Sequence, residues 1–288
     1  MNLQQVAYVV AAAELESFTR AAASIPVTQP SLSQGVRTLE RELGTPLFER
    51  IGRRVRLTAA GRAFIGPARR LLRDAAVARD VVADVAGLRA GRLDVVTLHT
   101  LAVDPLAGMV GEFRARHPGV TVHIAEPAAA DAAIESVHDG GCEIGLVELP
   151  AAPGLVVHEL AAQELLAVCP PGTPIVAGRL PVRRLAEMPL ITTPVGTATR
   201  RLLDDACAAA GVSPTVAVET GHREALLPLV LAGAGTTFLP SPRARIATAE
   251  GAVVASVDPP LDRKIGLIHR EGPLSPAAAA FVDVALAR

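Results

Sequence analysis

A face of hydroxyl, amide and guanidinium side chains lies near the start of the chain, on residues that we predict to form one helix. Leu32, Val36 and Leu39 recur at helical spacing, and Thr28 and Gly44 are residue types that begin and end helices. The other face carries Gln29, Ser31, Ser33, Gln34, Arg37, Thr38 and Arg41. These groups can read base edges and phosphates in the major groove of DNA. Taken alone, such a face is equally typical of an ordinary solvated helix.

The neighbouring elements favour the interpretation as a DNA-binding face. Ser17 is placed to begin a shorter helix that Pro26 ends, so two helices meet at a tight turn, as in a helix-turn-helix. Residues 47–50 and 55–58 are then predicted to be short strands, and their connecting tip carries Arg53 and Arg54. A hairpin with adjacent arginines at its tip is typical of a wing that reaches phosphates or the minor groove.

The charge distribution agrees with an anionic partner at this end. Residues 17–62 contain eight Arg and three Glu, a local charge of 8 − 3 = +5, in a chain whose formal net charge is −1. A basic segment in a mildly acidic chain indicates a partner such as DNA. Aromatic residues make up only 2% of the chain, which argues against a stacking platform for single-stranded nucleic acid.

The same segment resembles the DNA-binding domain of the LysR-type transcriptional regulators. Residues 17–61 read SFTRAAASIPVTQPSLSQGVRTLERELGTPLFERIGRRVRLTAAG and match that family in order: the AA pair, TQP, the Ser/Leu/Ser turn, the LE…LG…LF.R stretch and the closing LTAAG. Pro26, Thr28 and Tyr8 depart from the usual residues, but none of them removes an expected DNA contact. The resemblance implies that DNA is contacted by Thr28, Gln29, Pro30, Ser31, Ser33, Gln34, Arg37, Arg53 and Arg54.

A long helix is predicted next, from Thr58 to about Leu88. Its apolar residues alternate at spacings of four and three, the pattern of a helix that pairs with another helix: Phe64, Ala68, Leu71, Ala75, Ala78, Val82 and Val85. The alternative is a helix packed on its own domain. In the resembled family this helix joins two subunits, so we expect a homodimer or a homotetramer.

The remaining two-thirds of the chain alternates predicted strands and helices, which indicates an α/β domain with mainly parallel sheets. The segments FRARHPGV, residues 113–120, and LVLAGAGTTFLP, residues 229–240, are similar to the same family. The resemblance implies a winged helix-turn-helix over residues 1–58, a linker helix over 59–89 and an effector-binding domain over 90–288. That domain resembles periplasmic solute-binding proteins, with one lobe at about 90–161 and 267–288 and the other at about 162–266.

Ligands of α/β domains bind beyond the carboxyl ends of strands, where helix N-termini suit an anion. The candidates for the effector site are Thr97, His99, Thr100, Pro127, Ala128, Thr192, Thr193, Thr197 and His222. Each threonine is also a common cap or turn residue, and only their clustering at strand ends favours a ligand. The resemblance places the effector, which we expect to be a small organic anion, between the two lobes.

Other classes of protein fit the sequence less well. It contains no Gly-x-Ser-x-Gly, P-loop or HExxH motif, so we do not expect an enzyme or a cofactor. Cys142, Cys169 and Cys207 are widely spaced, which predicts reduced thiols without a metal. No apolar run is long enough to span a membrane, and no basic segment precedes the first apolar stretch, so we expect a cytoplasmic protein. A solute-binding receptor is the remaining alternative, and RNA polymerase is an expected partner if the regulator activates transcription.

Overall fold

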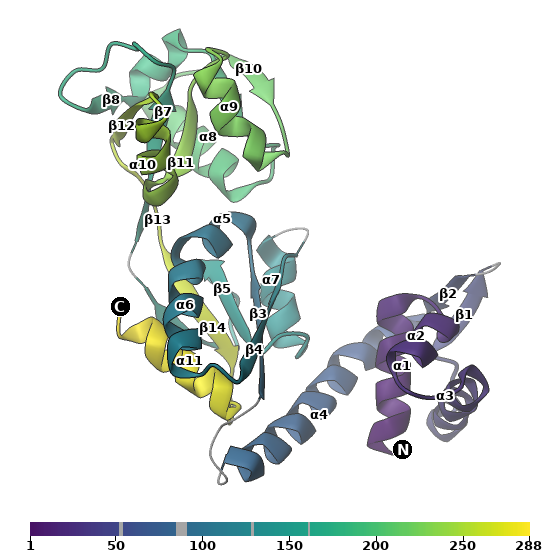
Figure 1. Cartoon of the computed structure of the whole chain (residues 1–288). Helices are drawn as coiled ribbons and strands as arrows, with labels where there is room; N and C mark the ends of the chain where they lie inside the picture. The colour runs from purple at the N-terminus through teal and green to yellow at the C-terminus, as the bar shows by residue number, and fades with distance from the viewer. Residues whose placement is uncertain (52–53, 85–90, 128–129, 161) are drawn as a thin grey trace.

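The computed structural model describes residues 1–51, 54–84, 91–127, 130–160 and 162–288 (Figure 1). The N-terminal domain contains α1 (Leu3–Leu15), α2 (Phe18–Ser24), α3 (Gln29–Leu43) and an antiparallel hairpin of β1 (Phe48–Ile51) and β2 (Arg54–Leu57). Asn2, Ser17 and Thr28 cap the three helices through their side chains. The helix-turn-helix and wing predicted from the sequence are therefore present, with each strand shifted by one residue.

Apolar residues of all three helices form the core of this domain. Val9, Leu32 and Leu39 are fully buried there, and Leu47 joins them from the start of the hairpin. Leu43, whose position in the apolar pattern also predicts burial, is 40% exposed. It occupies the last turn of α3, where Gly44 turns the chain away with a φ of +71°.

The long helix α4 (Ala59–Asp84) follows directly and carries Pro67 within it. The Thr58 hydroxyl accepts a hydrogen bond from the amide of Gly61 at 3.0 Å, as expected of the residue that begins a helix. Ile65 and Ala68, near its N-terminus, belong to the core of the N-terminal domain. The predicted helix extends to about residue 88, but residues 85–90 lie outside the described part of the chain.

The first lobe is built on a five-stranded sheet of order β4-β3-β5-β14-β6, and Figure 1 shows α6 and α11 on one side of it. The strands are β3 (Gly91–Thr97), β4 (Val120–Ala125), β5 (Ile144–Glu148), β6 (Leu155–Glu159) and β14 (Ile265–Arg270). The helices α6 (Ala107–Arg116) and α11 (Pro276–Leu286) pack Phe113 and Phe281 against one face. The helix α7 (Ala130–His138) covers the other face through Ala133 and Val137. Between β3 and α6 lie α5 (His99–Leu101) and η1 (Ala102–Leu106).

The second lobe has a sheet of order β11-β7-β12-β8, with β13 also paired to β7. Its strands are β7 (Gln163–Cys169), β8 (Arg179–Pro181), β11 (Thr237–Pro240), β12 (Val253–Asp258) and β13 (Leu261–Arg263), and a separate parallel pair is formed by β9 (Leu190–Thr192) and β10 (Val216–Glu219). The helical segments are η2 (Val182–Glu187), α8 (Ala198–Ala210), η3 (Arg223–Ala225), α9 (Leu226–Leu231) and α10 (Ser241–Ala249).

The prediction of mainly parallel sheets is wrong for this lobe. All three neighbours of β7 run antiparallel to it. For β13 the reason is the connection between lobes, because the chain enters through β7 and returns through β13, which lie side by side in opposite directions. The return strand β14 begins at Ile265, two residues before the expected boundary.

Candidate functional site

The polar face of α3 is exposed to solvent along its N-terminal half. Thr28, Gln29, Pro30, Ser31, Gln34 and Arg37 are exposed, and Ser33 is half-buried. Some of these groups are already engaged locally: Thr28 caps the helix and contacts the Ser31 hydroxyl at 2.8 Å, while Gln29 donates to Ser33 at 2.8 Å. Within the described residues, the side chains of Gln34 and Arg37 make no hydrogen bond to protein, so they are free to contact another molecule.

Two residues that we did not single out from the sequence hold α3 in place. Glu40 accepts hydrogen bonds from the amides of Leu47 and Phe48 at 2.8 and 3.2 Å, which ties the helix to the wing. A Cβ atom on Gly35 would lie only 2.6 Å from the Tyr8 ring, so a glycine allows α1 to approach closely. In the sequence, the position of Glu40 near the end of the predicted helix and the glycine in its middle could have indicated these two contacts.

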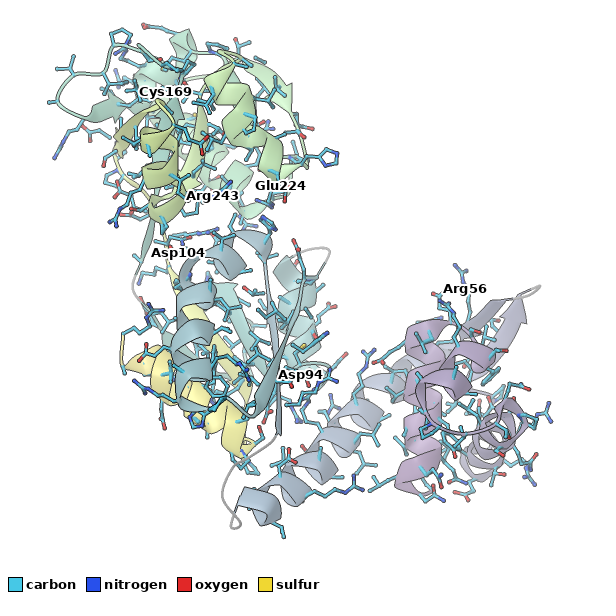
Figure 2. All side chains as sticks on the ribbon, in the orientation of Figure 1. Arg56, Asp94, Asp104, Cys169, Glu224 and Arg243 are labelled. Atoms are coloured by element: carbon cyan, nitrogen blue, oxygen red, sulfur yellow. The ribbon has the colours of Figure 1, made fainter. Side chains whose placement is uncertain are left out.

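The wing is described only in part. Arg54 begins β2, but its side chain, like residue 53 as a whole, lies outside the described part of the structure. Arg56 is exposed on the same strand and is labelled in Figure 2 beside the N-terminal helices. Arg56 is therefore a further positive charge at the end of the domain that carries the wing.

The apolar positions of α4 divide into two groups. Phe64 and Ala68, which the pattern assigned to a partner helix, instead pack in the core of their own N-terminal domain. Leu71 and Val82 are 39% and 73% exposed, and Ala75 and Ala78 lie on the same side of the helix. Val85 is outside the described residues. An apolar stripe thus remains uncovered in the second half of the helix.

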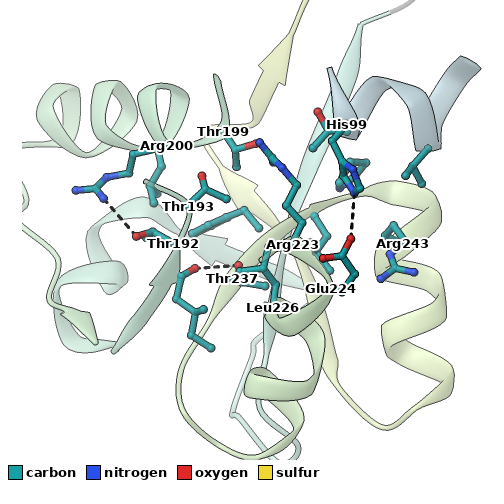
Figure 3. A pocket seen from close by; sticks show the side chains of 17 residues that line it. His99, Thr192, Thr193, Thr199, Arg200, Arg223, Glu224, Leu226, Thr237 and Arg243 are labelled. Carbon is teal, nitrogen blue, oxygen red and sulfur yellow. Dashed lines mark hydrogen bonds and ion pairs between the residues drawn. The ribbon is translucent and has the colours of Figure 1, made fainter. Parts of the chain in front are cut away.

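A cavity of about 200 Å³ lies between the two lobes, and Figure 3 shows its side chains. From the first lobe it is lined by His99, Thr100 and Val103, and from the second by residues that include Thr192, Thr193 and Phe238. The Thr192 hydroxyl accepts from Arg200 at 3.3 Å, and the Thr100 hydroxyl accepts from the buried Arg263 at 3.1 Å. Four of the predicted effector residues are therefore at this cavity.

The other predicted effector residues are not. Thr97 is 1% exposed, and its hydroxyl donates to the carbonyl oxygen of Leu146 at 2.8 Å, so it joins two strands instead of facing a ligand. Thr197 bonds to Thr193 and to the carbonyl oxygen of Pro194 in the turn before α8. His222 is exposed and Pro127 is half-buried, but neither lines the cavity. Ala128 lies outside the described residues.

Arginines are the principal cavity residues that we did not predict from the sequence. Arg200, Arg223 and Arg243 line the cavity. Arg200 is neutralised by Asp204 and Glu219, and the hydrogen bond with Asp204 is the main reason that its pKa is raised. No carboxylate oxygen of the described residues lies within 4.0 Å of the Arg223 or Arg243 guanidinium. Arg223 and Arg243 lie four and three residues after the ends of β10 and β11, and this position near strand ends could have identified them.

Buried charge extends from this cavity to the connection between the lobes. Arg263, 3% exposed, donates to the Gln163 amide oxygen at 2.8 Å, and Gln163 in turn donates to Asp104 at 2.7 Å. Burial lowers the pKa of Arg263 to about 10, and burial likewise lowers the pKa of Arg223. The Nη1 atom of Arg263 has no hydrogen-bond partner in the described structure. The cavity lining holds three arginines against the single acidic residue Glu224, and burial disfavours the charge on Arg223 and on the nearby Arg263, which suits an anion.

The cysteines lie outside these two sites. Cys142, Cys169 and Cys207 are free and buried, and burial raises the pKa of each thiol. The described residues contain no cluster of three or more metal-ligating side chains. In the same part of the chain, every helix is too short or too polar to cross a membrane.

A winged helix-turn-helix joined to a two-lobed domain with a cavity between the lobes defines a class, the ligand-responsive DNA-binding regulators. Residues 3–62 match the bacterial regulatory helix-turn-helix protein family of the LysR type, and residues 86–288 match the LysR substrate-binding domain. The chain belongs to the LysR family of transcriptional regulators. Members of this family regulate transcription and are not enzymes, in agreement with the expectation from the sequence.

Individual relatives match over the full length of the chain. The HTH-type transcriptional regulator IlvR of Caulobacter vibrioides is 31% identical, covering 96% of this chain and 94% of the relative, and TfdS of Cupriavidus pinatubonensis is 30% identical, covering 99% and 98%. Among solved structures, a full-length OxyR variant from Pseudomonas aeruginosa has a TM-score of 0.79 at 22% identity, covering 99% of this chain and 93% of that one. Full-length CbnR in complex with its target DNA has a TM-score of 0.67 at 25% identity, covering 100% and 99%.

Proposed function

We propose that this regulator binds a specific double-stranded operator through α3 and the wing, and that a small organic anion bound between the lobes modulates this binding. The observation that carries the proposal is the pair Arg223 and Arg243, which line an interlobe cavity without a carboxylate within ion-pair distance among the described residues. At Arg223 burial outweighs the attraction of Glu126 and Glu224, so the charged guanidinium is still disfavoured, and an anionic ligand would relieve that cost. No cofactor other than this effector is proposed.

The cavity also offers groups that select the rest of the ligand. Hydroxyls of Thr100 and Thr193 can accept or donate hydrogen bonds, while Phe238 and Leu203 provide apolar contact. His99 lies 4.0 Å from Glu224 across the two lobes, so polar groups of both lobes face each other at the cavity. A ligand that bridges Arg243 and His99 would stabilise the closed arrangement.

We further propose that the functional unit is a homodimer or a homotetramer. The exposed apolar stripe of α4, made of Leu71, Ala75, Ala78 and Val82, supports pairing of two such helices. Pairing places two α3 helices on one duplex, which raises the buried surface to the range of tight, specific complexes. If the regulator activates transcription, RNA polymerase is its further partner.

The DNA proposal is tested by fluorescence anisotropy with the duplex upstream of the protein's own gene and a scrambled duplex of equal length, over a salt series. We expect binding to the upstream duplex that is tighter by about a thousandfold or more, with a log–log salt slope of about −0.9 per phosphate contacted. Equal affinity for the upstream duplex, the scrambled duplex and a library of genomic fragments would contradict operator-specific binding.

The effector proposal is tested by thermal shift with a panel of small mono- and dicarboxylates and matched neutral amides. We expect at least one carboxylate, but not its amide, to raise the Tm of the natural protein, because only the carboxylate pairs with a guanidinium. Arg243→Gln should abolish that shift, while Arg245→Gln, an exposed arginine on the same helix, should preserve it. Equal shifts by carboxylate and amide would contradict an anion site.

A further inference from the structure

A line of hydrogen bonds connects Asp104 of lobe I, the lobe built on β3 to β6 and β14, with the cavity residue Thr100. The amide nitrogen of Gln163 donates to the carbonyl oxygen and to a carboxylate oxygen of Asp104, at 2.8 and 2.7 Å. Arg263 lies opposite Gln163 in the pairing of β13 with β7, and its Nε donates to the amide oxygen of Gln163 at 2.8 Å. The Nη2 atom of Arg263 donates to the Thr100 hydroxyl at 3.1 Å. The two chain segments that join the lobes thus act on a residue of the cavity wall.

The chemistry of the groups fixes the direction of every bond in this line. A backbone carbonyl oxygen only accepts, so the NH2 group of Gln163 faces Asp104 and the amide oxygen of Gln163 faces Arg263. A guanidinium only donates, and with a pKa of about 10 Arg263 keeps its charge at neutral pH. The oxygen of Thr100 is therefore the acceptor, and the hydroxyl proton of Thr100 is left for another partner.

This hydroxyl proton has no acceptor within the described part of the chain. Thr100 is half-buried and lines the cavity, and among the described residues its hydroxyl donates no hydrogen bond. Thr237, another cavity residue, is different, because its hydroxyl donates to the carbonyl oxygen of Ile191 at 2.9 Å. The wall that lobe I contributes therefore presents a hydroxyl proton to whatever occupies the cavity.

The opposite wall, from lobe II, repeats this arrangement. Nη1 of Arg200 donates to the Thr192 hydroxyl at 3.3 Å, a contact drawn as a dashed line in Figure 3. Thr192 also donates no side-chain hydrogen bond to the residues that the structure describes, so its proton is available too. The carboxylate of Glu224, which could accept from a ligand, belongs to a side chain that is 79% exposed and is largely solvated. Both walls therefore favour hydrogen-bond acceptors on the ligand.

An ammonium group on the ligand is a poor match for the wall at Thr100. It would leave the hydroxyl proton of Thr100 unpaired, and it would place a second positive charge beside Arg263. An oxo or carboxylate oxygen accepts that proton and is attracted by the same guanidinium. The wall at Thr100 therefore distinguishes ligands by the kind of polar group that meets lobe I.

We propose that Arg263 orients the Thr100 hydroxyl to donate to the effector, so that the regulator selects acids whose second polar group is a pure acceptor, an oxo group or a second carboxylate, over acids with an ammonium group there. This specificity rests on the proposed anion site, in which Arg223 and Arg243 of lobe II hold the first carboxylate. Arg263 does not line the cavity, and its role is to position Thr100.

The test is thermal shift of the full chain, titrated with two series of acids that each keep one carbon skeleton. The first series is valerate, levulinate, glutarate and γ-aminovalerate, and the second is benzoate, p-acetylbenzoate, terephthalate and p-(aminomethyl)benzoate. In at least one series we expect the oxo acid or the diacid to bind about tenfold more tightly than both the ammonium acid and the unsubstituted acid, because it gains the hydrogen bond from Thr100.

The possible failures of this proposal and of the anion site are distinguishable. Ammonium or unsubstituted acids that bind as tightly as the oxo acids and diacids would overturn the selection of an acceptor. A failure of every oxo acid and diacid to bind would overturn it as well. The anion site itself fails only if carboxylates and their amides give equal shifts.

Two substitutions of Thr100 test the hydroxyl directly. Thr100→Val keeps the shape of the side chain without the proton, so we expect the preference for the oxo acid or diacid over the ammonium acid to fall by about tenfold. Thr100→Ser restores the hydroxyl and should restore the preference. Thr121→Val, at an exposed threonine near the start of β4 and outside the cavity lining, should leave the preference unchanged.

The positioning role of Arg263 is tested by the same ratio of affinities, which a general loss of stability does not change. Arg263→Met removes the donor that orients Thr100, so the ratio should fall toward that of Thr100→Val. Arg263→Lys keeps a charged donor and should retain part of the preference. If Arg263→Met does not fold, the Thr100 variants still decide the proposal. An unchanged ratio in Thr100→Val, or in folded Arg263→Met, would overturn it.

Discussion

At the scale of single residues, we expect α3 to read bases and the wing to bind phosphates. Gln34 and Arg37 project from the exposed face, and Arg56 lies on the wing strand. Amide side chains read base edges, whereas a wing guanidinium meets phosphates that are present in every sequence. The structure thus offers two kinds of contact whose removal has different consequences.

Gln34→Ala should relax sequence preference, at a cost of about 1–3 kcal/mol for the operator and little for scrambled DNA. Arg53→Ala should weaken both duplexes alike and reduce the salt slope by about one unit. Anisotropy titrations on the two duplexes measure both effects. Equal losses of affinity for operator and scrambled DNA in both variants would contradict this division of roles between Gln34 and Arg53.

A pair of histidines in lobe I makes stability depend on pH. The Nε2 atoms of His158 and His269 are 3.0 Å apart, and Nδ1 of His269 lies 2.8 Å from the carbonyl oxygen of Arg270. Since that oxygen can only accept, Nδ1 carries the proton and Nε2 of His269 accepts from His158. Burial, and secondarily the neighbouring His269, lowers the pKa of His158.

We therefore expect the free energy of unfolding to fall as the pH is lowered below about 6.5. In that range the unfolded chain binds a proton at His158 that the folded chain takes up only at lower pH. His158→Gln should flatten this part of the stability curve, measured by urea denaturation between pH 7 and 5. His222→Gln, at an exposed position without a carboxylate within ion-pair distance among the described residues, is the control. Identical slopes for the natural protein and His158→Gln would refute the assignment.

At the scale of elements, α4 contacts two other parts of its own chain and leaves a further face exposed. Its start packs in the N-terminal core, one later face contacts lobe I, and another leaves Leu71 and Val82 exposed. The heptad pattern included Phe64 and Ala68 in the partner-facing stripe, because spacing alone does not distinguish a partner subunit from the helix's own domain. Only the folded N-terminal domain determines where that stripe begins.

Val82→Asp should weaken self-association by tenfold or more, since it introduces a charge into the proposed apolar interface, at a cost of roughly 1–3 kcal/mol. Ala76→Asp, exposed on another face of the same helix, should have little effect. Sedimentation velocity at micromolar concentration measures the change. A monomeric natural protein, or equal effects of the two substitutions, would contradict pairing through α4.

At the scale of the whole molecule, the cavity between the lobes and the surface of α3 belong to distant parts of one chain. If an effector couples them, the coupling is reciprocal. The free energy involved is expected to be about 1–3 kcal/mol, which changes affinity by roughly 5- to 150-fold. The proposed regulation therefore predicts an effect on ligand binding as well as on DNA binding.

We expect operator DNA to change the affinity for the effector by the same factor by which the effector changes the affinity for the operator. Isothermal titration of an active carboxylate into free and operator-bound protein measures the first factor, and anisotropy measures the second. Unequal factors would indicate a further linked equilibrium such as assembly. If the effector left DNA affinity, bending and footprint length unchanged, the proposal that it regulates DNA binding would be wrong.

The sequence by itself determined the winged helix-turn-helix, because caps, apolar spacing and breakers act locally, at Ser17, Thr28, Pro26 and Gly44. It also determined the family and the alternation of strands and helices. Four of the residues predicted from strand ends line the interlobe cavity, but Thr97 was not distinguishable from Thr100 without knowing which way each side chain points. Arg223, Arg243 and Arg263 come together only when residues 163–263 fold into the second lobe, and the contacts of Arg73 with residues 140 and 141 join residues about 70 positions apart. Those sites depend on long-range packing, and local sequence carries little information about which distant segments meet.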